Sequence, residues 1–251
     1  MGRGTAGGLV LLAAAVVWTG LCQPAAWPAL GSPLWVTAYT TTIAVVVSWP
    51  VGWSAGLYLA EAPPGALSRL LTLASDALLA APAVVVGLFA AAAFVSGLHL
   101  GLSILAGGLG LGVLNLPLAV RAGATAGQRV PPELRQASRA LGARPGQTLR
   151  RVVARQARRE LPGWLWLGVG RLLGECAVLV ATAGVTTPVP YPLDPRWPAA
   201  TLAVHLWYSS SASLAPHRVQ AQAAAGALLV LAAASVVAAR ALGGGRSVGQ
   251  G

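Results

Sequence analysis

The chain has 251 residues, of which 56% are hydrophobic and 9% are charged. With a mean hydropathy of +0.69, this is the composition of a membrane protein, and it excludes a soluble globular domain. The formal net charge is +11 and all 17 basic residues are arginine. Because the chain has no lysine, it lacks the residue that a P-loop places on nucleotide phosphates, which excludes a standard ATPase site.

Long apolar segments recur along the chain and predict an all-α membrane protein with about six transmembrane helices. The first segment is short, and we interpret it as a retained anchor rather than a cleaved signal peptide. The expected spans are 6–22, 35–60, 70–96, 102–120, 161–186 and 221–241. This divides the chain into a first helix with its outer loop (1–34), a core of five spans (35–243) and a disordered tail (244–251).

Several features mark the individual spans. Pro82 lies about two turns into the third span, and four closely spaced glycines in the fourth span predict close helix packing. A proline-rich segment at 188–198 follows the fifth span, and 201–214 is expected to form a short interfacial helix. The two cysteines lie in apolar runs and the three histidines are dispersed, so the sequence indicates neither a disulfide framework nor a metal site.

A basic block from Arg121 to Glu160 separates the fourth and fifth predicted spans and contains ten arginines. It must lie outside the bilayer, because an arginine at the centre of a membrane helix costs roughly 2.5–3.5 kcal/mol. Six spans place fourteen arginines on the side of the block and two on the other side. The positive-inside rule therefore predicts a cytoplasmic block and two cytoplasmic termini, and it favours the lipid bilayer over nucleic acid as the partner of this charge.

Two short helices are expected within the block. Pro131 and Pro132 suit a helix start, with Glu133 in the first turn. Gly142 permits a sharp turn, and Pro145 begins a second helix. The first helix has one weakly apolar face, formed by Leu134, Ala137, Ser138 and Leu141. Physical reasoning leaves two readings open: a basic loop that rests on anionic lipid, or a helical pair that docks a partner.

The block resembles the EAA loop of ABC-importer permeases, which reads Glu-Ala-Ala, three residues, Gly, nine residues and Ile-x-Leu-Pro. Gln136, Ala137, Ser138 and Gly142 match its first part, although Gln136 replaces the glutamate and Arg155 the proline. In that family the element is a coupling helix that docks in a groove of the ATPase. The resemblance assigns ATPase coupling to Glu133, Leu134, Gln136, Ala137, Ser138, Leu141, Gly142 and Ala143.

Four patches in the same order resemble the phosphate-uptake permeases, and particularly the second of their two permease subunits. The patches are 57–61, 80–89, 116–153 and 171–184. The sequence departs from that pattern at Ala83, Val86, Ala124, Thr125 and Cys176. The resemblance implies a type I ABC-importer permease in the bacterial plasma membrane, with a coupling loop at about 121–160, that catalyses no bond breaking itself.

The same resemblance implies the partners. They are a second permease subunit, a dimer of ABC ATPase subunits and an extracytoplasmic substrate-binding protein. No cofactor is expected on this chain, since ATP and Mg are used by the partner ATPase. The predicted function is permeation of inorganic phosphate. The alternatives are another oxyanion (molybdate, tungstate or sulfate), some other small solute, or a membrane scaffold with a lipid-binding basic loop.

Arg171 and Glu175 stand four residues apart in the fifth predicted span, where unpaired charges would be costly. One reading is a mutual ion pair that neutralises both charges. The other is that the pair lines the substrate path, because a guanidinium binds an oxyanion bidentately. Pro82 is the third residue that we assign to this path.

Overall fold

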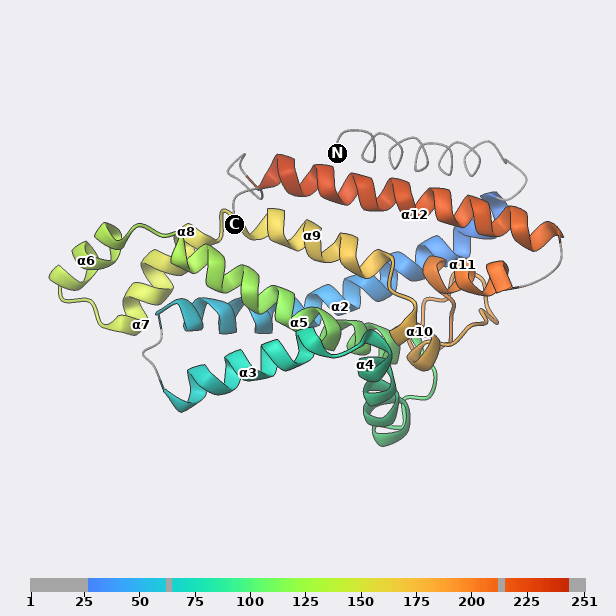
Figure 1. Cartoon of the computed structure of the whole chain (residues 1–251), viewed down its shortest axis with the longest axis horizontal. Coiled ribbons are helices and arrows are strands. Elements are labelled where there is room, and N and C mark those ends of the chain that lie inside the picture. The colour runs from blue at the N-terminus through green and yellow to red at the C-terminus, as the bar shows by residue number, and fades with distance from the viewer. Residues whose placement is uncertain (1–26, 62–64, 212–214, 244–251) are drawn as a thin grey trace, which may run out of the picture. The chain divides into compact units, whose positions relative to one another are not determined.

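The computed structural model describes residues 27–61, 65–211 and 215–243, and these residues are mostly helical (Figure 1). The chain divides into two compact units. Unit 1 comprises residues up to Ile43, Ala83–Leu111 and Gly170–Ala234, and unit 2 comprises Ala44–Pro82, Gly112–Val169 and Ser235 onward. In chain order the helices are α2 (Trp27–Glu61), α3 (Ala66–Ala80), α4 (Ala83–Ala90), the π-helix η2 (Ala91–Gly97), α5 (Ile104–Gln128), α6 (Pro132–Ala140), α7 (Pro145–Thr148), the π-helix η3 (Leu149–Val153), α8 (Ala154–Ala157), α9 (Leu161–Leu173), α10 (Ala177–Thr182), α11 (Leu202–Ser211) and α12 (Ala215–Leu242).

Three helices in the described part of the chain are long and apolar enough to cross a membrane: α2, α5 and residues 217–242 of α12. The number rises to four if α3 and the α4–η2 helix form one broken span. These helices confirm an all-helical, multi-pass membrane protein. The first predicted span, 6–22, lies outside the described residues, as do most of the 1–34 segment and the 244–251 tail.

Two predicted spans are interrupted. The third breaks at Ala81 (φ −68°, ψ 132°), because the residue before a proline is pushed out of the α region and Pro82 follows. The fifth is divided between α9 and α10. At this break the Glu175 carboxylate accepts a hydrogen bond from the Ala177 N–H (3.0 Å), which caps α10. The fifth predicted span, 161–186, is therefore not one continuous helix.

The helix of the fourth predicted span is longer than 102–120. α5 continues through Pro117 and past Arg121 to Gln128, so the first residues of the basic block are helical. Apolar Ala122 and Ala126 are buried on this extension, and they give the helix a packed face beyond the first arginine. The predicted 201–214 helix is present as α11, within Leu202–Ser211.

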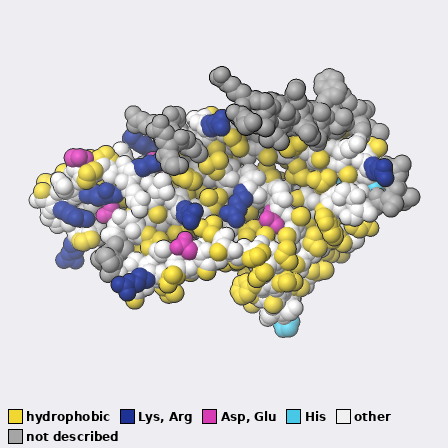
Figure 2. Space-filling view, viewed as in Figure 1, with side chains coloured by type: hydrophobic (Ala, Val, Ile, Leu, Met, Phe, Trp, Pro, Cys, Tyr) yellow, Lys and Arg dark blue, Asp and Glu magenta, His cyan; other side chains and the backbone are white. Residues whose placement is uncertain are grey.

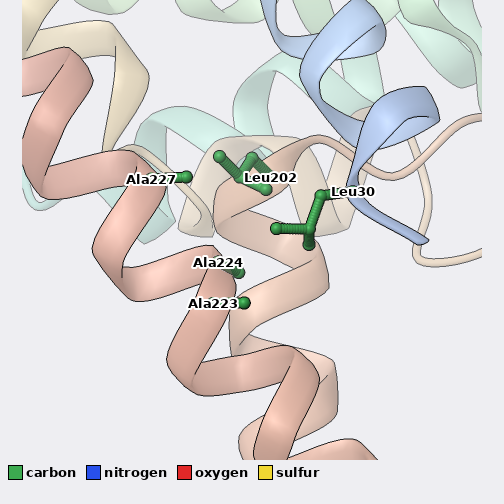
Figure 3. Packing of buried hydrophobic residues seen from close by; sticks show 5 residues of the cluster. All are labelled: Leu30, Leu202, Ala223, Ala224 and Ala227. Atoms are coloured by element: carbon green, nitrogen blue, oxygen red, sulfur yellow. The ribbon is translucent and has the colours of Figure 1, made fainter. Parts of the chain in front are cut away.

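The core of unit 1 is built from small residues on α12 that admit leucines of α2 and α11. One buried cluster consists of Leu30, Leu202, Ala223, Ala224 and Ala227 (Figure 3). The segment after α10 is fixed by backbone groups, because the Ile104 and Leu105 N–H groups donate to the carbonyls of Trp197 and Pro195. These contacts satisfy the first donors of α5, which have no partner within the helix.

The core of unit 2 places α2 very close to α5. A Cβ atom on Gly56 would overlap the Val120 carbonyl oxygen, and one on Gly123 would overlap that of Trp53. Only glycine permits the two backbones to approach so closely. A buried cluster in the same unit joins α2 and α5 to η3 and α8. It consists of Leu57, Ala126, Val130, Val153 and Ala157.

Candidate functional site

The predicted partner-docking element corresponds to α6, α7, η3 and α8, which we call the α6–α8 segment (residues 132–157). It lies at one end of unit 2, on the left in Figure 1. Arginine side chains gather over this end in Figure 2. The two predicted helix starts are confirmed: α6 begins at Pro132 with Glu133 in its first turn, and α7 begins at Pro145.

The turn after α6 is a Schellman motif. The Gly142 N–H donates to the Arg139 carbonyl (2.9 Å) and the Ala143 N–H donates to the Ser138 carbonyl (3.2 Å), which is the hydrogen-bond pattern that closes a helix at a left-handed residue. Gly142 has φ +79°, in the region where glycine is strongly favoured. The predicted sharp turn at this glycine is therefore confirmed, and its hydrogen bonds fix the direction of the chain into α7.

A side-chain contact joins the two helices of this turn. The Ser138 and Thr148 hydroxyl oxygens lie 3.0 Å apart, and Thr148 is fully buried. Breaking this part-buried contact is costly, because the buried Thr148 hydroxyl would lose its partner. Ser138 was predicted as part of the weakly apolar face of the first helix, and the structure places its hydroxyl against Thr148.

The rest of the predicted apolar face is open to solvent. Leu134 is 42% exposed and Leu141 is 89% exposed, while Gln136 and Ala137 are exposed and Ala143 is half-buried. Leu141 occupies the residue immediately before the left-handed glycine, at the apex of the turn. A nearly fully exposed leucine gains nothing from folding of this chain alone, so it is available for burial by a partner.

Arg135 fixes α6 to the rest of unit 2. Its guanidinium forms an ion pair with the Glu61 carboxylate in the last turn of α2. It also donates to the carbonyls of Gly127 (2.7 Å) and Val130 (3.0 Å) at the end of α5. Glu61 also lies 3.6 Å from the Arg139 guanidinium. One arginine side chain therefore links the ends of two membrane helices to the projecting helix.

The residues that we assigned to the substrate path have separate environments. Arg171 is exposed in the last turn of α9, and Glu175 is half-buried at the break before α10. Of the two readings of Arg171 and Glu175, the mutual ion pair does not form. Glu175 instead accepts a hydrogen bond from the Ala177 N–H, and neither residue belongs to an ion pair among the described residues. Pro82 is exposed at the break between α3 and α4. Asp76 forms an exposed pair with Arg121, at 3.7 Å.

Sequence reasoning missed two polar contacts inside unit 2. Glu61 was noticed only as the end of a motif, and its pairing with Arg135 joins residues 74 positions apart. Asn115 donates to the Ser48 hydroxyl (3.2 Å), and both residues are fully buried between α5 and α2. A single asparagine in an apolar span was the available signal, because an amide buried in a membrane helix needs a partner.

Unit 1 contains a hollow of about 370 Å³. Its lining includes His205 and Tyr208 of α11 and His217 of α12. Burial and, to a smaller extent, the nearby His217 lower the pKa of His205. No group of three or more histidine, cysteine or acidic side chains in the described residues could hold a metal ion.

Comparisons with known proteins agree with this architecture. The chain is 34% identical over 190 residues to the probable ABC transporter permease protein YqgI of Bacillus subtilis, covering 71% of this chain and 65% of that protein. It is 34% identical over 151 residues to the phosphate transport system permease protein PstA 1 of Mycobacterium tuberculosis (60% and 50% covered). It is 33% identical over 155 residues to PstA of Pasteurella multocida (61% and 53% covered).

The chain thus spans about half to two thirds of the length of these relatives. A family model matches residues 49–243, which include α5, the α6–α8 segment and all of α12. The match covers most of the sequence and all of the described part of unit 2 from Trp49 onward. The chain belongs to the family of binding-protein-dependent transport system inner membrane components.

Proposed function

We propose that this chain is a permease subunit of an ATP-driven ABC importer for inorganic phosphate. Its family consists of inner membrane components of transport systems, and two of the relatives described above are phosphate transport permeases by name. The observation that carries the proposal is the α6–α8 segment. It combines an exposed leucine on a sharply defined turn with a rigid attachment to the ends of α2 and α5.

The coupling surface consists of Glu133, Leu134, Gln136, Ala137, Ser138, Leu141, Gly142 and Ala143. Leu141 and Leu134 supply its apolar contacts, and the Schellman turn at Gly142 holds Leu141 at the apex. When the ATPase moves, Arg135 transmits the displacement of α6 to Glu61 at the end of α2. The transfer is direct, because the ion pair and the two carbonyl contacts leave α6 little freedom to move alone.

The partners follow from this role. They are a second permease subunit, a dimer of ATPase subunits that binds ATP and Mg, and an extracytoplasmic substrate-binding protein. The α6–α8 segment and both chain termini lie on the cytoplasmic side, in agreement with the distribution of arginine. The chain itself lines the path and transmits the movement of the ATPase to the membrane helices, and it performs no covalent chemistry.

The path includes Arg171, Glu175 and Pro82. Arg171 is exposed, and no carboxylate of the described residues pairs with its guanidinium, which suits an oxyanion. Glu175 shapes the break that ends α9, and Pro82 shapes the break that ends α3. Breaks in membrane helices are tolerated where they line a cavity. Molybdate, tungstate and sulfate share the charge and shape of phosphate, so they are the alternative substrates.

The substrate is tested by uptake of labelled phosphate into proteoliposomes that contain this chain with its co-purifying partners. We expect ATP-dependent phosphate uptake that excess molybdate or sulfate does not suppress. ATP hydrolysis stimulated only by a different solute would keep the coupling role and reject phosphate. The absence of any ATPase partner would favour a membrane scaffold and reject the whole proposal.

The coupling surface is tested separately with two exposed leucines. Leu141→Ser alters the apex of the turn, and Leu193→Ser alters a 77% exposed leucine in unit 1. Neither change should destabilise the chain, because neither side chain is buried. A central apolar anchor contributes about 2 kcal/mol to an interface, so only Leu141→Ser should weaken ATPase binding, by roughly thirtyfold. Equal effects of the two substitutions would reject the assignment.

A further inference from the structure

Beside the coupling surface, the α6–α8 segment ends in an arginine-rich hollow of about 300 Å³. It is lined by Arg155, Gln156, Arg158 and Arg159. A second hollow of about 350 Å³ shares Gln156 and Arg159 with it and continues to Ala126, Val130 and Ala157. Both hollows lie in unit 2, where α8 turns into α9. The first of them has no carboxylate in its lining.

In the described part of the chain, the three arginines of the first hollow form no ion pair with a carboxylate. All six acidic residues of the chain lie in the described part, and none of them forms an ion pair with Arg155, Arg158 or Arg159. The nearest candidate in sequence, Glu160, binds Arg129 at 2.8 Å and lines the second hollow. Arg155 lies on α8, and Arg158 and Arg159 lie in the turn that follows it. Since like charges close together repel one another, this hollow is suited to an anion from outside the chain.

The position of the hollow along the chain identifies the kind of anion. α9 begins at Leu161, after Arg158, Arg159 and Glu160, and carries no charge until Arg171. Trp166 lies in its second turn and is 38% exposed, whereas Trp164 packs against a buried cluster of unit 2. An exposed tryptophan next to a basic cluster at the start of an apolar helix marks the level of the lipid headgroups. Arginine also binds phosphate through two parallel hydrogen bonds, which suits a phosphodiester.

We propose that Arg155, Arg158 and Arg159 form a binding site for the headgroup phosphate of an anionic phospholipid. The phosphodiester occupies the first hollow, which has no carboxylate in its lining. The apolar residues of the second hollow, Ala126, Val130 and Ala157, cover the uncharged part of the lipid next to the phosphodiester. The site does not depend on which solute is transported. The bound lipid anchors the C-terminal end of the α6–α8 segment to the membrane surface.

The site is tested on the full chain with its co-purifying partners, purified in uncharged detergent and titrated with phosphatidylglycerol while bound lipid is counted by native mass spectrometry. The test variant is R155Q/R158Q/R159Q. The matched control is R144Q/R150Q/R151Q, which removes the same charge from exposed positions outside both hollows. Each arginine near a membrane surface contributes about fivefold in affinity. We therefore expect roughly hundredfold weaker binding in the test variant and little change in the control.

Three results would overturn the proposal. Equal weakening in both variants would show diffuse attraction to charge, and unchanged binding in the test variant would place the lipid elsewhere. Displacement of the lipid by millimolar inorganic phosphate would show a site for a free anion. If the triple variant does not elute as a folded species, Arg158→Gln against Arg150→Gln gives the same comparison, with an expected fivefold difference.

Discussion

Arg135 of α6 and Glu61 of α2 form an ion pair that is largely hidden from water, with side-chain exposures of 18% and 11%. Arg135 also holds two carbonyls at the end of α5. Its guanidinium therefore connects three helices of unit 2. In a transporter that converts ATPase movement into helix movement, such a connection has to be stiff, and a planar side chain with several fixed donors provides this better than lysine.

The first prediction is that Glu61→Gln destabilises the chain. Removing one member of a buried pair leaves the other charge uncompensated, which costs about 3–5 kcal/mol. Thermal unfolding in detergent should show a clear decrease, and limited proteolysis should cut earlier near residues 129–144. In the reconstituted complex we expect ATP hydrolysis with little solute uptake.

Asp76→Asn is the control for this substitution. It also removes a carboxylate that pairs with an arginine in unit 2, but Asp76 and Arg121 are 58% and 64% exposed. Exposed pairs contribute little, so the unfolding temperature should hardly change. If Glu61→Gln proved as harmless as Asp76→Asn, the connection between α2 and α6 would not be a structural element.

The elements of this fold that depend on local residues were predictable from the sequence, and those that depend on distant ones were not. Two prolines and a glycine mark the ends of α6 and α7, because each acts on its own backbone. The break of the fifth predicted span has weaker markers. Arg171, Gly174 and Glu175 interrupt the apolar run there, but that Glu175 accepts a hydrogen bond from the Ala177 N–H at the start of α10 is visible only in the structure.

The candidate site shows the same division. The apolar face of α6 could be read from its spacing, and Leu141 is exposed as a docking residue requires. Ser138 belonged to that face by spacing, yet it contacts Thr148 from the next helix. The roles of Glu61 and Arg135 depend on α2 and α6 coming together, which no periodicity within either helix encodes.

The second prediction concerns the left-handed turn at Gly142. A Cβ atom there would meet no other atom within 4 Å, so a substitution acts only through φ. Gly142→Val should destabilise the turn by about 1–2 kcal/mol, and Gly142→Pro should abolish uptake because it also removes the N–H that binds the Arg139 carbonyl. Gly142→Asn should retain most uptake, since asparagine tolerates this conformation. Full uptake by Gly142→Pro would contradict the coupling role.

The third prediction concerns the crossing of α2 and α5. Gly56→Ala places a methyl group against the Val120 carbonyl oxygen, so the helices must separate, at a cost of about 1–3 kcal/mol. The purified chain should unfold at a lower temperature. Gly146→Ala is the matched control, because a Cβ atom there meets nothing within 4 Å and alanine favours the helix. A similar loss in both variants would show that the close approach carries no special cost.

The fourth prediction is a pH dependence of stability in unit 1. Burial and the neighbouring His217 lower the pKa of His205, so the unfolded chain binds a proton at this residue more readily than the folded chain does. The stability that neutral His205 contributes is therefore fully present above the ordinary histidine pKa of about 6.5. This contribution is lost as the pH falls from that value toward the lower pKa of His205 in the folded chain. The unfolding temperature should decrease between about pH 7.5 and pH 5.5, and His205→Gln should reduce this decrease. His99→Asn, at an exposed histidine outside the hollow, should leave it unchanged, and an equal effect of both substitutions would rule out His205 as its source.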